Sequence, residues 1–140
     1  MPDGNFSTVR SPNPEEKDAL TIAIEKAKGI LMKRKELSEI WNGDYYLDIA
    51  NIVRFTPSAC NTQPWIVDSS ENEIKVHRYR KPGKRGIMPI DMVKHYNQID
   101  IGIFLCFLEI CLNKNNIKFE RTLYVEENVD NEKNLTATYK

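Results

Sequence analysis

The sequence has little of the residues on which several protein classes depend. It contains three cysteines and two histidines among 140 residues, and no two cysteines have the close spacing of a zinc or redox motif. His77 and His95 stand alone, without a carboxylate at a spacing typical of catalysis. We therefore predict no metal site and no disulfide, and we expect the cysteines to be buried small hydrophobic residues.

The sequence also lacks an excess of charge and a long hydrophobic run. Twenty Lys and Arg balance twenty Asp and Glu, which argues against a dedicated nucleic-acid binder. The longest apolar run, residues 99–112, is interrupted by Asp100 and Glu109 and is too short to span a bilayer. Residues 1–5 lack the basic and apolar regions of a signal peptide. We expect a cytoplasmic protein with no membrane or nucleic-acid partner.

The remaining pattern is typical of one globular domain of mixed secondary structure. Residues 20–24 suit either a helix or a buried strand. Apolar periodicity predicts a helix over 45–55, capped by Asp44 and ended before Pro57. A second helix over 97–113 is apolar on nearly all sides, which is typical of a central helix or one shared with a partner. Alternation predicts strands at 65–67, 74–79, 119–125 and 135–139.

The most unusual segment is the predicted loop between the first helix and the first strand. It reads Thr56-Pro57-Ser58-Ala59-Cys60-Asn61-Thr62-Gln63-Pro64-Trp65. Its neutral donors and acceptors could read the edge of a planar heterocycle, and loops held by rigid elements often carry binding groups. The alternative is a helix stop followed by an Asx turn, because ordinary loops are also polar.

This stretch resembles the Pro-Ser-[Ser/Ala]-x-Asn-x-Gln-Pro-Trp motif of the nitroreductase family of flavoproteins. A second segment, Ile99-Asp100-Ile101-Gly102-Ile103, is similar to the "DxGI" that opens the long central helix of that family. A third segment, residues 31–40 followed by Asn42-Gly43-Asp44, resembles a linker in a compact, diverged subgroup. The resemblance covers most of the chain from about Ala19 onwards.

The resemblance implies an α+β fold, with an antiparallel or mixed sheet packed by helices and one central apolar helix. It implies an extended arm over 1–18, a nitroreductase-like domain over 19–140 that corresponds mainly to the C-terminal portion of the family, and a strand at 20–24. The implied function is FMN-dependent transfer of hydride from NAD(P)H to a nitroaromatic, quinone or similar acceptor, in a homodimer with FMN at the interface. No dedicated catalytic side chain is required, because the cofactor carries the redox chemistry.

The resemblance also implies which residues bind the cofactor. The turn against the flavin and the polar positions that tie down the loop or reach the cofactor are Pro57, Ser58, Ala59, Asn61 and Gln63. Trp65 matches a packing position. The FMN phosphate needs cations, which Lys33, Arg34 and Lys35 could supply, although a solvated charge run is the alternative for these three residues.

Two alternative functions remain open at this stage. Residues 1–21 lack the Arg-Arg-Ser-x-Arg segment with which many relatives grip the phosphate, so the chain could be a non-catalytic remnant that dimerises or binds a partner. Residues 78–85 carry six cations and a tyrosine, which could suit a nucleic-acid backbone. A solvated hairpin loop explains that run better, given the neutral total charge.

Overall fold

The computed structural model describes residues 19–22, 33–80, 86–125 and 127–140. The chain divides into two units, Met1–Lys33 and Arg34–Lys140. In the first unit, residues 19–22 are helical and exposed, so the strand expected over 20–24 is wrong for its described part. Leu20 and Ile22 are 54% and 53% exposed and pair with no strand, which removes the burial that a β-branched run needs. The arm predicted over 1–18 lies outside the described residues.

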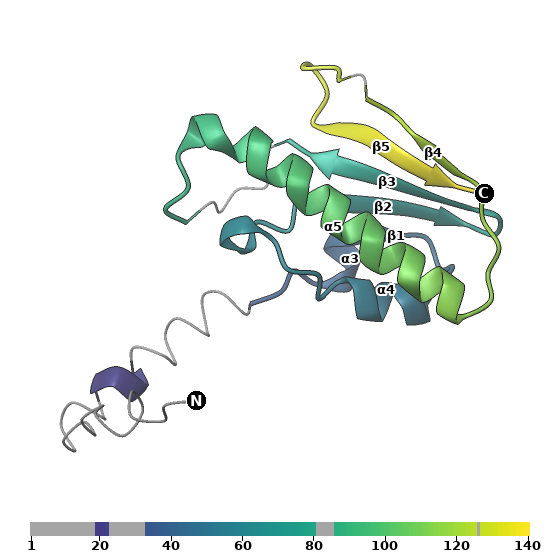
Figure 1. Ribbon diagram of the computed structural model, residues 1–140, viewed down its shortest axis with the longest axis horizontal. Helices are drawn as coiled ribbons and strands as arrows, with labels where there is room; N and C mark the ends of the chain where they lie inside the picture. The colour runs from purple at the N-terminus through teal and green to yellow at the C-terminus, as the bar shows by residue number, and fades with distance from the viewer. Residues whose placement is uncertain (1–18, 23–32, 81–85, 126) are drawn as a thin grey trace, which may run out of the picture. The chain divides into compact units, whose positions relative to one another are not determined.

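The second unit contains a five-stranded mixed sheet in the order β1-β2-β3-β5-β4 (Figure 1). Its β1–β2 pair is parallel and the other pairs are antiparallel, which confirms the α+β class with a mixed sheet. The last strand in the sequence lies inside the sheet, between β3 and β4. The strands are β1 (Trp41–Asn42), β2 (Trp65–Ser70), β3 (Glu73–Tyr79), β4 (Arg121–Leu123) and β5 (Lys133–Tyr139).

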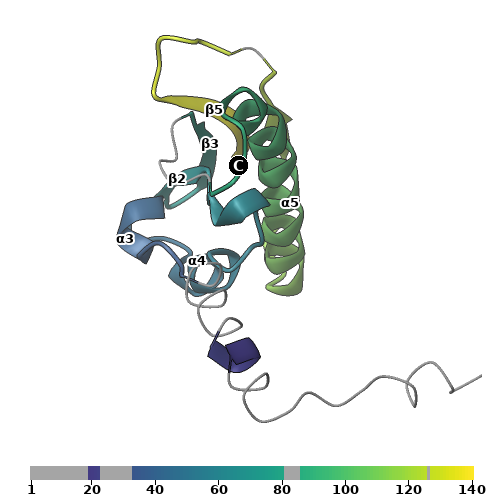
Figure 2. The same ribbon diagram turned by 90° about the vertical axis from the view of Figure 1, so that its left-hand side faces the viewer.

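One long helix, α5, lies along one face of this sheet, and α4 packs beside it (Figures 1 and 2). The helix α5 begins four residues before the predicted start. The predicted cap of α4 is wrong, because the helix begins after Tyr46, which is in the left-handed conformation, and Asp44 does not cap it. The helices are α3 (Leu37–Ile40), α4 (Leu47–Val53) and α5 (Val93–Lys114), with short 3-10 turns η1 (Ala59–Asn61) and η2 (Ile90–Met92).

The hydrophobic core lies between the sheet and the helices α4 and α5. Trp65, at the start of β2, is fully buried and stacks on Phe104 of α5, with ring centroids 4.8 Å apart. Such a pair contributes about 0.5–1.5 kcal/mol beyond the area that it buries. On β3, Ile74 and Val76 are buried in the same core, as their alternation predicts. The core therefore fixes the start of β2, where the polar loop ends.

The helix α5 has apolar side chains on two opposite sides. One side packs in the core, through residues such as Ile101 and Leu108, while Ile99 and Ile110 on the other side are 50% and 57% exposed. This explains why the sequence is apolar nearly all round. It also corrects the expectation of buried cysteines, because Cys106 lies on the exposed side. Cys60 is half-buried, and Cys111 is buried as expected.

Of the helices in the described ranges, none combines the length and the apolar character that crossing a membrane requires.

Candidate functional site

The polar loop between α4 and β2 has a backbone that its residue types do not favour. Cys60, Asn61 and Gln63 have φ values of 50°, 52° and 48°, in the left-handed region. Each such conformation costs a residue with a side chain roughly 1–2 kcal/mol. Contacts with the rest of the unit must therefore hold the loop in place.

The first set of contacts comes from α5. Asp100, 4% exposed, accepts a hydrogen bond from the Ala59 backbone N–H through Oδ1, at 2.9 Å. Its Oδ2 accepts a second bond from Asn97 Nδ2, at 3.0 Å, and the same Nδ2 donates to Thr62 Oγ1 at 2.8 Å. Asn97 is completely buried. Two polar side chains on an otherwise apolar helix thus bind both ends of η1.

The second set of contacts comes from the segment before α3. Arg34 donates from a guanidinium nitrogen to Asn61 Oδ1 at 2.5 Å. The Lys35 backbone N–H donates to Gln63 Oε1 at 2.9 Å, and Lys35 Nζ donates to the Gln63 carbonyl oxygen at 3.2 Å. Four of the residues predicted to bind the cofactor therefore lie together, although they come from segments 27 or 28 positions apart.

Bonds within the loop complete its structure. The Gln63 backbone N–H donates to Ser58 Oγ at 2.9 Å, and Thr62 Oγ1 donates to the Ala59 carbonyl oxygen at 3.0 Å. Thr56 Oγ1 donates to the Val53 carbonyl oxygen at 2.7 Å, where α4 ends. The side chains of Ser58, Asn61 and Gln63 thus tie down the loop, which is one of the two roles that the resemblance implies for the polar positions.

A third cation, Arg54 at the end of α4, lies against the same segment. It donates to the Lys35 carbonyl oxygen at 3.2 Å, and its Nε is buried without a hydrogen-bond partner among the described residues. Arg34, Lys35 and Arg54 all donate to neutral oxygens, and none of the three forms a salt bridge with a described carboxylate. Positive charge therefore gathers beside the loop without being neutralised locally.

Burial shifts two titratable groups in this region. Desolvation raises the pKa of Asp100, opposed by the hydrogen bonds from the Ala59 backbone and Asn97. Burial also lowers the pKa of Lys35, against the attraction of Glu39. Both shifts come mainly from loss of water, which indicates a polar site set into a partly closed surface.

The outer edge of the loop is open to solvent. Pro57 is exposed, and Ser58 and Ala59 are half-buried. The neighbouring Phe55 side chain is 56% exposed and lies under the Arg54 guanidinium, 5.1 Å from its ring centroid. This edge offers apolar and polar groups to a ligand, whereas Gln63 is 4% exposed and faces inward.

Sequence reasoning missed several residues of the site. Asn97, Asp100 and Thr62 were not assigned roles, although an Asn and an Asp inside an apolar helix are a signal of a buried polar contact. Arg54 was noted only as part of the motif. Lys33 is exposed and belongs to the first unit, so its predicted role stays a prediction.

A family model described as "Putative TM nitroreductase" matches residues 5–112. The chain belongs to this nitroreductase family. Neither a curated protein nor a solved structure matched the chain. The nitroreductase match includes the loop, both sets of residues that hold it and most of α5. It ends before β4 and β5, and the expectation that the chain corresponds mainly to the C-terminal portion of the family stays a prediction.

Proposed function

We propose that the protein is an FMN-dependent oxidoreductase that transfers hydride from NAD(P)H to a nitroaromatic, quinone or similar acceptor, as a cytoplasmic homodimer. The observation that carries this proposal is the loop at 56–64, which has the nitroreductase motif and is held by α5 on one side and by cations on the other. Membership of the nitroreductase family supports the reaction class.

The residues beside the loop fit the two chemically different ends of FMN. Arg34, Lys35 and Arg54 have no carboxylate partner among the described residues, and Arg54 Nε has an unused donor in the described region. Cations of this kind suit a phosphate, because guanidinium groups bind its oxygens in pairs. The open edge at Pro57 and Ala59 would lie against the flavin ring.

Bound FMN would supply the hydride chemistry, so the protein needs no acid or nucleophile of its own. The chain's residues bind and orient. Asp100 and Asn97 set the position of η1, and Asn61 and Gln63 hold the Arg34 and Lys35 side chains in place. The loop is therefore fixed before any ligand arrives, which limits the entropy lost on binding.

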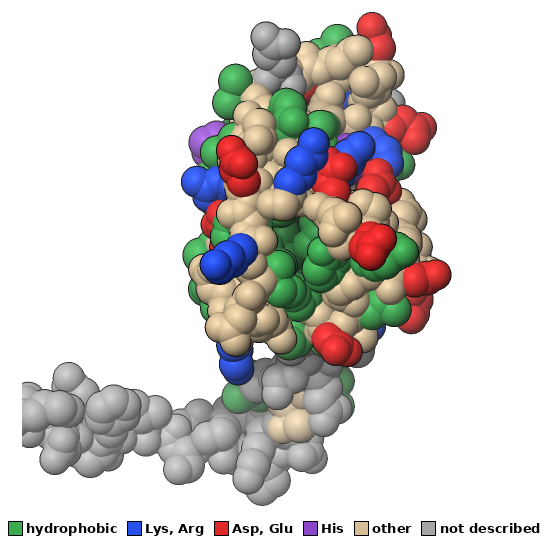
Figure 3. All heavy atoms as spheres, turned by 90° about the vertical axis from the view of Figure 1, so that its right-hand side faces the viewer, with side chains coloured by type: hydrophobic (Ala, Val, Ile, Leu, Met, Phe, Trp, Pro, Cys, Tyr) green, Lys and Arg blue, Asp and Glu red, His purple; other side chains and the backbone are tan. Residues whose placement is uncertain are grey.

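The homodimer is proposed to use the exposed side of α5. Tyr96, Ile99, Cys106 and Ile110 are exposed at a spacing of three, seven and four residues, so that they line one side of the helix. Hydrophobic side chains also gather between charged ones on the face that carries the C-terminal end of this helix (Figure 3). A second copy would cover this apolar stripe and bring its own loop near the first.

Comparing FMN with riboflavin tests the phosphate site. We expect the protein to quench the fluorescence of both, and Arg34→Gln with Lys35→Gln to weaken FMN binding by about tenfold or more while riboflavin binding changes little. Lys118→Gln, at an exposed lysine after α5, is the matched control and should bind both flavins normally. Equal losses for FMN and riboflavin would contradict the assignment of these cations to phosphate.

Activity and assembly test the rest of the proposal. The FMN-loaded protein should oxidise NADH or NADPH when menadione or a nitrofuran is present, and should sediment as a dimer. Ile110→Lys should shift the sedimentation toward monomer, because it places a charge in the proposed interface. A dimer that neither binds FMN nor oxidises either nucleotide would contradict the enzymatic function.

A further inference from the structure

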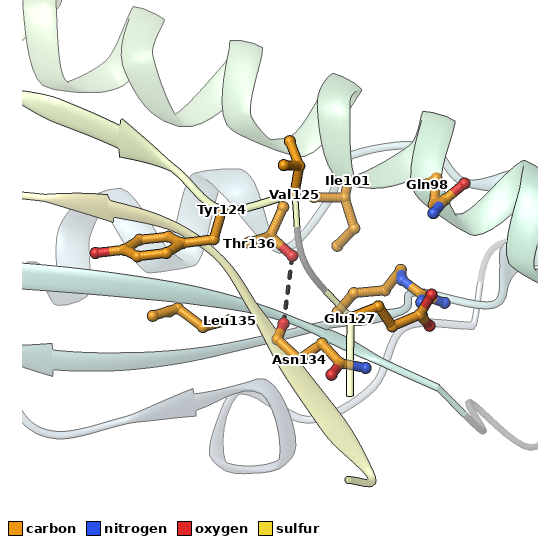
Figure 4. A pocket seen from close by; sticks show the side chains of 9 residues that line it. Gln98, Ile101, Tyr124, Val125, Glu127, Asn134, Leu135 and Thr136 are labelled. Atoms are coloured by element: carbon orange, nitrogen blue, oxygen red, sulfur yellow. Dashed lines mark hydrogen bonds and ion pairs between the residues drawn. The ribbon is translucent and has the colours of Figure 1, made fainter. Parts of the chain in front are cut away.

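A pocket of about 270 Å³ lies between α5, the end of β3 and the segment that joins β4 to β5 (Figure 4). Arg78 contributes to it from β3, since its register partner Trp65 faces the same side of the sheet as α5. Ile101 lines it from α5, and Tyr124 and Asn134 from the last two strands and their connection. Residues 113–140 lie outside the family match, so the family does not account for this pocket.

Positive charge is in excess at this pocket. Arg78, which is 6% exposed, and Lys94 both form ion pairs with Glu127, with Lys94 Nζ 2.5 Å from Oε2. Arg80 Nε lies 3.5 Å from the same carboxylate. Within the described ranges, three cations therefore share one carboxylate, and the cluster keeps two positive charges. A second anion is favoured there, because the buried guanidinium has few water molecules to solvate it.

A buried donor without a partner lies beside the cluster. Asn134 is 8% exposed, and its Oδ1 accepts a hydrogen bond from the Asn128 backbone N–H at 3.0 Å. This bond fixes the orientation of the amide, since only the oxygen can accept. Its Nδ2 is buried and has no hydrogen-bond partner among the described residues. An unmade bond of this kind costs about 1–3 kcal/mol, which a ligand oxygen would recover.

The other walls of the pocket are apolar. Ile101 lies above the cavity on α5, and Tyr124, Val125 and Leu135 approach it from the opposite elements (Figure 4). The volume is near the lower limit for small-molecule sites. A ligand of this pocket therefore needs an anionic group at one end and a small apolar body at the other.

We propose that this pocket binds a small organic carboxylate with a ring-sized apolar body. The Arg78, Arg80 and Lys94 cluster holds the carboxylate, Asn134 Nδ2 donates to one of its oxygens, and Ile101 and Tyr124 pack against the body. Glu127 is a carboxylate already bound by the same cations, so it shows which group they accept and competes with the ligand for them. The site requires no flavin and is independent of the loop.

Titration of the full chain with benzoate tests the site, with benzamide as the neutral isostere and inorganic phosphate as the anion without an apolar body. We expect calorimetry to detect benzoate at millimolar concentration and neither of the other two. Glu127→Gln should tighten benzoate binding by about five- to tenfold, because the competing charge is gone. Asn134→Asp keeps the acceptor for Asn128 but adds a negative charge, and should weaken binding by at least about tenfold.

Two further variants keep the test decisive. Lys94 is 60% exposed, so Lys94→Gln should fold normally and weaken benzoate binding severalfold even where Glu127→Gln is unstable. Lys140→Gln, at an exposed lysine paired with Glu73, should leave binding unchanged. Equal binding of benzamide, equal binding of phosphate, weaker binding by a folded Glu127→Gln variant, or no effect of Lys94→Gln would each overturn the proposal.

Discussion

Replacing Asp100 by alanine tests whether α5 holds the candidate loop. The carboxylate accepts hydrogen bonds from the Ala59 backbone N–H and from Asn97 Nδ2, at 2.9 and 3.0 Å. Alanine leaves both donors unpaired, at about 1–3 kcal/mol each, while it relieves part of the desolvation of the carboxylate. We therefore expect Asp100→Ala to lower the free energy of unfolding by about 2–4 kcal/mol.

Amide hydrogen exchange would locate this loss in the molecule. Exchange at Ala59 and Thr62 should accelerate by at least about tenfold in the variant, beyond the change seen in the strands β3 and β5. Glu109→Ala is the matched control, because it removes a carboxylate of α5 whose partner is Arg121, an exposed pair that contributes about 0–1 kcal/mol. Unchanged exchange at Ala59, or the same acceleration in the control, would refute the reasoning.

The raised pKa of Asp100 predicts a pH dependence that Asp100→Asn removes. Burial raises the pKa of the folded carboxyl, so the folded protein binds the proton more tightly than the unfolded chain does. The stability from this group is therefore fully present below the unfolded value, about 4, and is lost as pH rises through the folded pKa. The difference in denaturation midpoint between wild type and Asp100→Asn should fall over that interval. A constant difference would show that the folded pKa is not raised.

Two further predictions concern the fold. Gly43 has a φ of 91°, and a Cβ there would lie 2.3 Å from the Ser69 carbonyl oxygen, so Gly43→Ala should destabilise by about 2 kcal/mol or more in urea denaturation; Gly102→Ala, in open space on α5, should instead stabilise by about 0.5–1 kcal/mol. Trp65→Ala should lower the free energy of unfolding by about 3–5 kcal/mol, since it removes the stack on Phe104; a loss below 1 kcal/mol would contradict the central place of this pair.

Local patterns carried most of the fold of the second unit. Alternation placed β2, β3 and β5 within two or three residues of their observed ends, because one face of each strand is buried in the core. The two-residue strand β1 was not predicted, since its parallel pairing with β2 depends on a contact between segments 26 positions apart. Asp44 is a good cap by residue type, but the left-handed Tyr46 starts α4 later. Patterns along the chain contain neither kind of information.

The motif located the candidate site, but its internal contacts were beyond reach from the sequence. The nitroreductase resemblance marked residues 56–65 and also 31–40, without indicating that Arg34 would bind Asn61 or that Lys35 would bind Gln63. These pairs form only once the sheet has brought the two segments together.

The strained backbone explains why so many polar side chains are concentrated in one short loop. Glycine would adopt the left-handed φ values of Cys60, Asn61 and Gln63 at little cost, but it would offer no side chain to fix the conformation. Asn61 and Gln63 accept that cost and make bonds that hold the Arg34 and Lys35 cations. A loop built in this way is rigid and keeps its cations in place while its edge at Pro57 stays open. Those are the properties that an anionic cofactor would require of it.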